Sequence, residues 1–159
     1  MVVPLSEELV KKLHEAVLAG DPQAIRGYRH EGMVRVCIER PFSVVYGFEP
    51  FKTVVDKAAA LMFSVNTFHP FNDGCRRTSL LATYFFLLFN GYHFTIRKDM
   101  ITLTSKIAKR ELKNERAVAR LIRQSCTETS ILLCPENISD DEPLLTRFLL
   151  ALMKTSWVR

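Results

Sequence analysis

The chain has 159 residues, 48% of them hydrophobic, which suits one globular domain with a packed core and excludes a disordered chain. Its 22 basic and 17 acidic residues leave a formal net charge of +5, an excess that suits a nucleotide, a nucleic acid or an acidic partner and selects none of them. The four cysteines have no metal-ligand spacing, so they indicate neither a zinc site nor a disulfide framework.

The sequence shows no sign of export or of a membrane span. Its first residues lack the basic start and long apolar run of a secretory signal. The most apolar stretch, residues 80–89, is far shorter than the roughly 20 residues that span a bilayer. We therefore expect a cytoplasmic protein without membrane contact, and we interpret this stretch as a buried helix.

Two helices are predicted at the start of the chain. Ser6 can cap the first helix and Gly20 can end it. The second, shorter helix is predicted over residues 21–28, opened by Asp21 and Pro22. Helical spacing relates four apolar residues of the first helix, Leu9, Leu13, Ala16 and Val17.

The pattern changes between residues 32 and 51, where prolines and a glycine interrupt a series of β-branched residues. We predict a short hairpin or an exposed flap in the later part of this segment. A helical stripe then covers residues 52–66 and stops at His69 and Pro70, because a proline keeps the residue before it out of helical geometry. Residues 67–74 are therefore predicted to form a loop between two buried helices.

The helix after this loop is predicted to run from Gly74 or Cys75 to Asn90 and is apolar nearly all round, as expected for the central helix of a small bundle. Two more helices are predicted over residues 99–112 and 114–126. Their available caps are Asp99 and Asn114, and Gly91 is the stop of the central helix.

The C-terminal part of the chain has a different composition. Residues 127–142 are acidic and contain two prolines, so they are predicted to link a final amphipathic helix, residues 143–157, to the rest. We expect one mainly α domain over residues 1–126 and an appended segment over residues 127–159. The apolar face of the last helix is expected to pack on the core, with a partner or dimer surface as the alternative.

Residues 69–77 gather groups that suit phosphate chemistry. The first amides of the helix after Gly74 carry partial positive charge and can bind a phosphate, and a glycine lets that phosphate approach the backbone. Arg76 and Arg77 add positive charge and bidentate donors. We therefore predict a nucleotide or phosphate site formed by Gly74, Cys75, Arg76 and Arg77.

Two more residues of this loop indicate a reaction. His69, neutral for part of the time near pH 7, is the candidate base that takes the proton from an attacking hydroxyl. Asp73 stands just before the anion site, where a carboxylate can hold a Mg²⁺ ion that bridges the phosphates. His69 and Arg77 are thus the predicted catalytic residues, Asp73 is the predicted metal ligand, and Phe71 is expected to pack inward.

This segment resembles the signature of the Fic/Doc family, in which the order is His, any residue, Phe, any residue, Asp or Glu, Gly or Ala, Asn, Gly or Lys, and Arg. The matching residues are His69, Phe71, Asp73, Gly74 and Arg77. A weaker resemblance extends over about residues 5–112. It implies the family's helical bundle with a β-hairpin flap, which we place at residues 41–51, between Pro41 and Pro50, and which aligns a target segment by strand addition.

Two departures from the signature bear on the reaction. Members that transfer AMP have a second arginine three residues after the first, where this sequence has Leu80. Doc-type members also lack it, and they move a terminal phosphoryl group to a hydroxyl of a translation factor. Leu80 and Arg76 therefore favour Doc-like phosphoryl transfer over AMP transfer, which stays the alternative. Cys75 stands where the family has asparagine, so a side-chain hydrogen bond to the phosphate is weakened or lost.

Two other interpretations remain open. Loss of the asparagine favours a degenerate module that binds a nucleotide or a partner without turnover. Alternatively, Cys75 lies at a helix N-terminus beside two arginines, so its thiol is expected to have a lowered pKa and to act as a nucleophile or redox sensor. His14, His30 and His93 have no comparable setting and are interpreted as surface or packing residues.

The resemblance also implies cofactors and partners. Mg²⁺ is the expected cofactor and ATP the expected co-substrate. The expected protein substrate is a translation factor or another hydroxyl-bearing target, and the setting is a toxin-antitoxin pair. A small antitoxin or a second copy of the chain is expected to dock on the helix at residues 143–157. Neither a membrane nor a nucleic acid is an expected partner.

Overall fold

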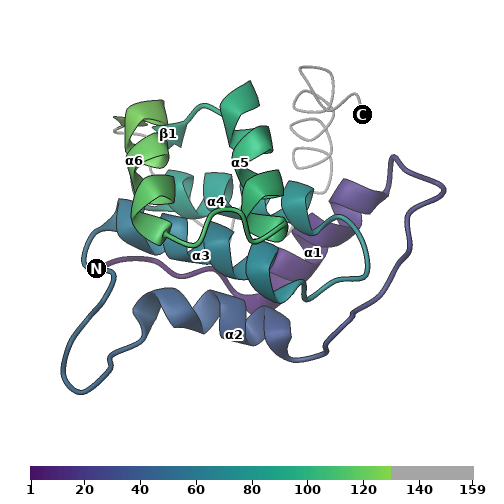
Figure 1. The fold of residues 1–159 in the computed structure, drawn as a ribbon, viewed down its shortest axis with the longest axis horizontal. Coiled ribbons are helices and arrows are strands. Elements are labelled where there is room, and N and C mark those ends of the chain that lie inside the picture. Colours follow the sequence, from purple (N-terminus) through teal and green to yellow (C-terminus); the bar gives the residue numbers. More distant parts are fainter. Residues whose placement is uncertain (130–159) are drawn as a thin grey trace.

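The structure, a computed structural model, describes residues 1–129. The predicted helix at residues 143–157 and most of the predicted linker lie outside the described residues. Figure 1 shows the order of the described elements, which is α1 (Glu7–Leu18), α2 (Met33–Glu39), the 3₁₀ helix η1 (Arg40–Phe42), α3 (Val54–Phe68), α4 (Cys75–Phe89), β1 (Tyr92–Phe94), α5 (Lys98–Ala108), α6 (Glu115–Ser125) and β2 (Cys126–Glu128).

Two helices, α3 and α4, form the centre of this mainly α fold (Figure 1). α3 packs against α2, α4, α5 and α6, and α4 also packs against α1 and α5. Nearly every side chain of α4 is buried, as predicted for the central helix, and Leu80 and Phe86 belong to this core. No helix within residues 1–129 is long and apolar enough to cross a membrane.

Local capping explains where several helices begin. The Ser6 hydroxyl accepts a hydrogen bond from the Leu9 amide at 3.1 Å, and the Asn114 side chain accepts one from the Arg116 amide at 2.9 Å, so both predicted caps are confirmed. The predicted cap Asp99 is wrong, because α5 begins one residue earlier with Arg97 as its N-cap. The starts of α1 and α6 were therefore predictable, because a capping side chain directly precedes each helix.

The predicted helix over residues 21–28 is absent from the structure. Instead, the backbone at Gly27 to Arg29 runs beside the loop between α3 and α4: the Gly27 carbonyl accepts a hydrogen bond from the Asn72 amide at 3.0 Å, and the Arg29 amide donates one to the Pro70 carbonyl at 2.9 Å. This pairing with a segment more than 40 residues away needs extended backbone, so it excludes a helix there.

The small antiparallel sheet was not predicted from the sequence. β1 and β2 pair with Phe94 opposite Cys126 and Tyr92 opposite Glu128. The helix predicted over residues 114–126 therefore ends at Ser125, and the first residues of the predicted linker belong to β2. α2 was missed as well, because its β-branched residues gave a strand-like pattern.

The predicted flap (residues 41–51) contains a minimal β-hairpin. The Val45 amide donates to the Phe48 carbonyl at 2.8 Å, and the Phe48 amide donates to the Val45 carbonyl at 2.9 Å. Between them Tyr46 and Gly47 have φ angles of 49° and 77°, so both central residues are left-handed, as a type I′ turn requires. The flap projects from the body between η1 and α3 (Figure 1).

Candidate functional site

The predicted loop enters directly from the end of α3. His69 is the C-cap of this helix, with left-handed angles of φ 47° and ψ 61°, and its amide still donates to the Val65 carbonyl at 3.3 Å. A left-handed residue turns the chain sharply away from the helix axis. The candidate base therefore lies directly at a helix end. The helix itself ends at Phe68, two residues later than the predicted end at residue 66.

Phe71 fastens the loop to the body of the protein. Its side chain is buried, as predicted, and its ring stacks on that of His14 with centroids 3.6 Å apart and planes inclined by 10°. Tyr28 packs on the same ring at a centroid distance of 5.6 Å, and the two residues also form an antiparallel backbone bridge. The loop is thus held from two sides by distant segments.

Gly74 makes the turn into α4 in a backbone conformation that favours glycine. Its φ of 73° is left-handed, and a Cβ placed there would lie 3.0 Å from Cδ2 of Leu18 in α1. The preceding Asp73 is half-buried, and its Oδ1 accepts a hydrogen bond from the Gly74 amide at 2.5 Å. The carboxylate predicted to hold a metal ion therefore lies beside the start of α4.

The start of α4 has the electrostatic character of an anion site. The N-cap of α4 is Gly74, which has no side chain to form a capping hydrogen bond, and the first turn of α4 contains no acidic residue. The amides of Cys75, Arg76 and Arg77 fall in the turn that has no intrahelical partners, so they carry the positive end of the helix dipole. A phosphate group fits this position.

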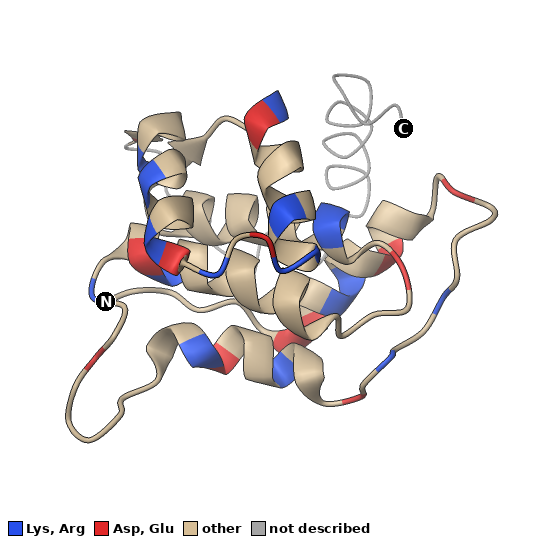
Figure 2. Cartoon of the chain, viewed as in Figure 1, with Lys and Arg blue, Asp and Glu red and all other residues tan. Residues whose placement is uncertain are grey.

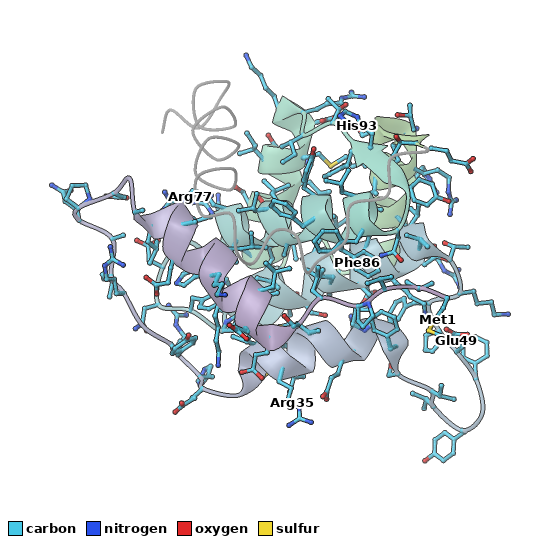
Figure 3. All side chains as sticks on the ribbon, turned by 180° about the vertical axis from the view of Figure 1, so that it is seen from behind. Met1, Arg35, Glu49, Arg77, Phe86 and His93 are labelled. Carbon is cyan, nitrogen blue, oxygen red and sulfur yellow. The ribbon has the colours of Figure 1, made fainter. Side chains whose placement is uncertain are left out.

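The two arginines lie on opposite sides of this helix start. Arg77 is 29% exposed and lies by the C-terminal end of α1, where its Nη2 is 3.8 Å from Oδ2 of Asp21 (Figure 3). Arg76 is exposed and donates to Oγ of Ser105 in α5 at 2.8 Å. Figure 2 shows further basic residues where α5 ends beside the start of α4. The structure therefore flanks the anion site with positive charge from both sides.

The surroundings of His69 favour a neutral imidazole. Partial burial lowers the pKa of His69 below its ordinary value of 6.5, and the positive charges of Arg29 and Arg110 act in the same direction. A hydrogen bond to the backbone of Ala108 opposes them. A neutral ring with a free lone pair is the form that accepts a proton, so this setting is compatible with the predicted role of His69 as a base.

Cys75 does not have the setting that its sequence position suggested. Its thiol is buried and donates to the Phe71 carbonyl at 3.3 Å. Burial raises the pKa of Cys75, so the expected lowering is wrong: desolvation of the thiolate outweighs the hydrogen bond to the Phe71 backbone and the positive charge of Arg29. The Cys75 amide remains available to an anion, whereas the reading of Cys75 as a nucleophile or redox sensor loses its basis.

His14 is a residue of this site that the sequence analysis placed only among packing or surface residues. It lies in α1 with 1% of its surface exposed, and its Nδ1 is 3.0 Å from Oγ1 of Thr78 in the first turns of α4. Its Cε1 would be 3.6 Å from a Cβ on Gly74. The imidazole thus contacts the loop at Phe71 and α4 at Thr78, but its distance in sequence left no local signal.

The carboxylate chemistry of the site suits Mg²⁺ bound together with a nucleotide. Within residues 1–129 no group of three or more His, Cys, Asp or Glu residues can hold a metal ion on its own. Mg²⁺ usually takes one or two protein carboxylates and completes its shell with substrate phosphates and water. A single Asp73 beside an anion site fits that requirement.

Comparisons with known proteins agree with this site. Residues 4–87 match the family model described as the Fic/DOC family. The protein named Toxin Doc from Mycolicibacterium smegmatis is 29% identical over 109 residues, which cover 67% of this chain and 82% of that protein. The similarity therefore points to the Doc branch. Because the family model spans more than half of the chain and includes the whole loop from His69 to Arg77, the chain belongs to the Fic/Doc family.

Proposed function

We propose that this protein is a Doc-like toxin that transfers the terminal phosphoryl group of ATP to a hydroxyl of a target protein. The observation that carries this proposal is Leu80, which is fully buried in the core. AMP-transferring members use an arginine at this position to hold the outer phosphates, and a side chain in the apolar core cannot do so. The similarity to a protein named Toxin Doc supports the same branch.

Each residue of the loop has a role in the proposed reaction. His69 takes the proton of the target hydroxyl, whose oxygen forms a bond to the terminal phosphorus while the bond to the leaving ADP breaks. The α4 amides and Arg77 stabilise the negative charge on the phosphoryl oxygens. Asp73 would hold Mg²⁺, which when bound neutralises phosphate charge.

The flap (residues 41–51) is the proposed contact for the target. Four of its apolar side chains are exposed: Val44, Val45, Tyr46 and Phe48. Exposed apolar residues on a hairpin suit the addition of an extended segment, in which backbone hydrogen bonds give affinity and alternate side chains give specificity. A hydroxyl carried by that segment would be the phosphoryl acceptor.

The test is incubation of the purified protein with bacterial lysate, Mg²⁺ and ATP labelled on either the α or the γ phosphate. We expect label from the γ phosphate alone on a lysate protein, no label with His69→Ala, and unchanged labelling with the exposed control His30→Ala. Label from the α phosphate alone would replace the Doc assignment with AMP transfer.

A binding module without turnover is the second candidate, and the replacement of asparagine by Cys75 favours it. In that case neither label is transferred, although Mg-ATP still binds in calorimetry. Asp73→Ala should then weaken Mg-ATP binding, whereas His69→Ala should leave it largely unchanged.

A further inference from the structure

The only buried lysine within residues 1–129 is Lys57, in the second turn of α3, and it has no part in the reaction described above. Its side chain is 4% exposed, although lysine is almost never buried unless it is paired. Its ammonium group donates three hydrogen bonds: to the Pro41 carbonyl at 3.2 Å, to the Phe51 carbonyl at 2.7 Å and to Oε1 of Glu49 at 2.5 Å. All three of its N–H donors are therefore used.

These three acceptors all belong to the flap. Pro41 is its first residue and Phe51 its last, so one ammonium group joins both ends of the flap to α3. Glu49, labelled in Figure 3, lies on the segment that returns from the turn and supplies the opposite charge. The flap is thus closed at its base by a single side chain of the central helix.

The hairpin needs such a fastening. Within the flap a single antiparallel bridge, Val45 with Phe48, connects the two arms. An isolated two-stranded hairpin is marginally stable in water even with a longer ladder. Its tip cannot contribute packing, because Tyr46 is fully exposed. Order in the flap must therefore come from its base.

Aromatic contacts reinforce the same base. The Lys57 Nζ lies 5.0 Å from the ring centroid of Phe42, and the Arg40 guanidinium lies 5.2 Å from that of Phe51. Arg40 also donates to Oγ of Ser64 in α3 at 3.2 Å. Both ends of the flap are thus tied to α3, the helix that ends at His69.

We propose that Lys57 is a positioning residue that fixes the flap relative to the catalytic loop. α3 carries Lys57 near its start and His69 at its end, so it sets the distance between the target-binding hairpin and the base. This role rests on the proposed transfer reaction, in which the flap binds the target protein. A fixed flap then presents the acceptor hydroxyl of the target to His69. Loss of the lysine releases the flap and leaves the phosphate site intact.

Hydrogen exchange of the full-length protein tests the anchor without any need for activity. In Lys57→Met we expect the Val45 and Phe48 amides, which are bonded only within the hairpin, to exchange about tenfold faster or more, since hydrogen bonds from a charged group are lost. Amides in the middle of α4 should keep their rates. The matched control Lys113→Met, at an exposed lysine, should change neither set.

A second variant keeps the test sharp if Lys57→Met folds poorly. Glu49 is half-exposed, so Glu49→Gln removes the charge from the flap side at little risk to the fold, and it should raise exchange at the same two amides by a smaller factor. Unchanged exchange in the flap, or an equal rise in α4, would show that Lys57 only supports the core and would overturn the proposal.

Transfer assays separate this proposal from the proposed function. If the wild type transfers γ label, Lys57→Met should raise the lysate concentration that gives half-maximal labelling while Mg-ATP affinity in calorimetry stays unchanged. A loss of Mg-ATP affinity would contradict a positioning role. If the wild type transfers no label, the proposed function fails, and the exchange rates still decide whether Lys57 anchors the flap.

Discussion

At the scale of single residues, His14 has a buried ring nitrogen, Nε2, without a hydrogen-bond partner within residues 1–129. Burial lowers its pKa to about 4, so the ring is neutral at pH 7. This neutral ring stacks on Phe71 and bonds to Thr78, which links α1 to the loop before α4 and to α4 itself. Protonation of His14 would therefore disturb the contacts that hold α1 against Phe71 and Thr78.

The lowered pKa of His14 predicts a loss of stability in acid. In the unfolded chain the ring takes up its proton near its ordinary pKa of 6.5, whereas in the folded protein it does so only near pH 4. Between these values the unfolded state binds more protons, so the free energy of unfolding falls as the pH falls, by roughly 3 kcal/mol from this residue.

Urea denaturation at pH 7 and at pH 4 measures this effect. His14→Phe keeps an aromatic ring against Phe71 but cannot be protonated, so its stability should fall less between the two pH values than that of the wild type. His30→Gln, at an exposed histidine, is the control and should behave as the wild type does. Parallel curves for wild type and His14→Phe would contradict the assignment.

The lowered pKa of His69 makes a prediction about activity. A base must be neutral, so the transfer rate should fall in acid only below the ordinary histidine pKa of 6.5. Arg29 contributes to the lowering by its charge, so Arg29→Gln should raise the pKa of His69 and move the acidic limb toward higher pH. The pH profile of γ-label transfer measures the position of this acidic limb. Arg120→Gln, at an exposed arginine distant in sequence, is the control and should leave it unchanged.

Only part of the candidate site was predictable from the sequence, for a physical reason. His69, Asp73, Gly74 and Arg77 fall within nine consecutive positions, where a motif can be read. His14 and Lys57 reach the loop or the flap from helices, and their roles depend on tertiary contacts such as the bond between His14 and Thr78, 64 positions apart. Cys75 was misjudged because the sequence indicates a helix start but not that its thiol is buried.

At the scale of elements, the central helices were predictable because their signals are local. Helical spacing and caps mark α1, α3, α4 and α6 in adjacent residues. The extended stretch at residues 27–30 and the pairing of β1 with β2 are fixed by partners more than 30 positions away. Backbone pairing of this kind leaves little trace in composition, which is why these elements were missed.

The junction between the loop and α4 gives a prediction at this scale. Gly74→Ala forces a side chain into left-handed geometry and against Leu18, whereas Gly32→Ala has the same backbone cost with nothing within 4 Å of the new Cβ. The left-handed conformation alone costs roughly 1–2 kcal/mol in each variant. We therefore expect Gly74→Ala to lose more stability than Gly32→Ala in urea denaturation, because only the former also crowds the Leu18 side chain of α1.

The same pair of variants separates stability from binding. Displacement of the Gly74 turn moves the first amides of α4, so Gly74→Ala should weaken Mg-ATP binding in calorimetry. Gly32→Ala should bind Mg-ATP as the wild type does, since Gly32 is the N-cap of α2 and lies outside the loop. Equal affinities for both variants would argue against an anion site at the start of α4.

At the scale of the whole molecule, the last described strand joins residues 126–128 to the helical bundle. β2 pairs with β1, the Thr95 amide donates to the Ser125 carbonyl at 3.0 Å, and the Thr129 amide donates to the Gly91 carbonyl at 2.9 Å. Phe94, on β1 opposite Cys126, is 1% exposed. The sheet therefore closes the C-terminal end of α4, whereas the candidate phosphate site lies at the start of this helix.

Two shortened chains test this connection. A chain that ends at residue 129 keeps the whole sheet, whereas a chain that ends at residue 125 loses β2 and its hydrogen bonds to residues 91–94, each worth roughly 0.5–1.5 kcal/mol. We expect the longer form to unfold cooperatively in urea and the shorter form to be less stable by about 2 kcal/mol or more. Because the sheet and the loop lie at opposite ends of α4, the folded fraction of either form should bind Mg-ATP equally well; equal stability of the two forms would place the domain boundary before β2.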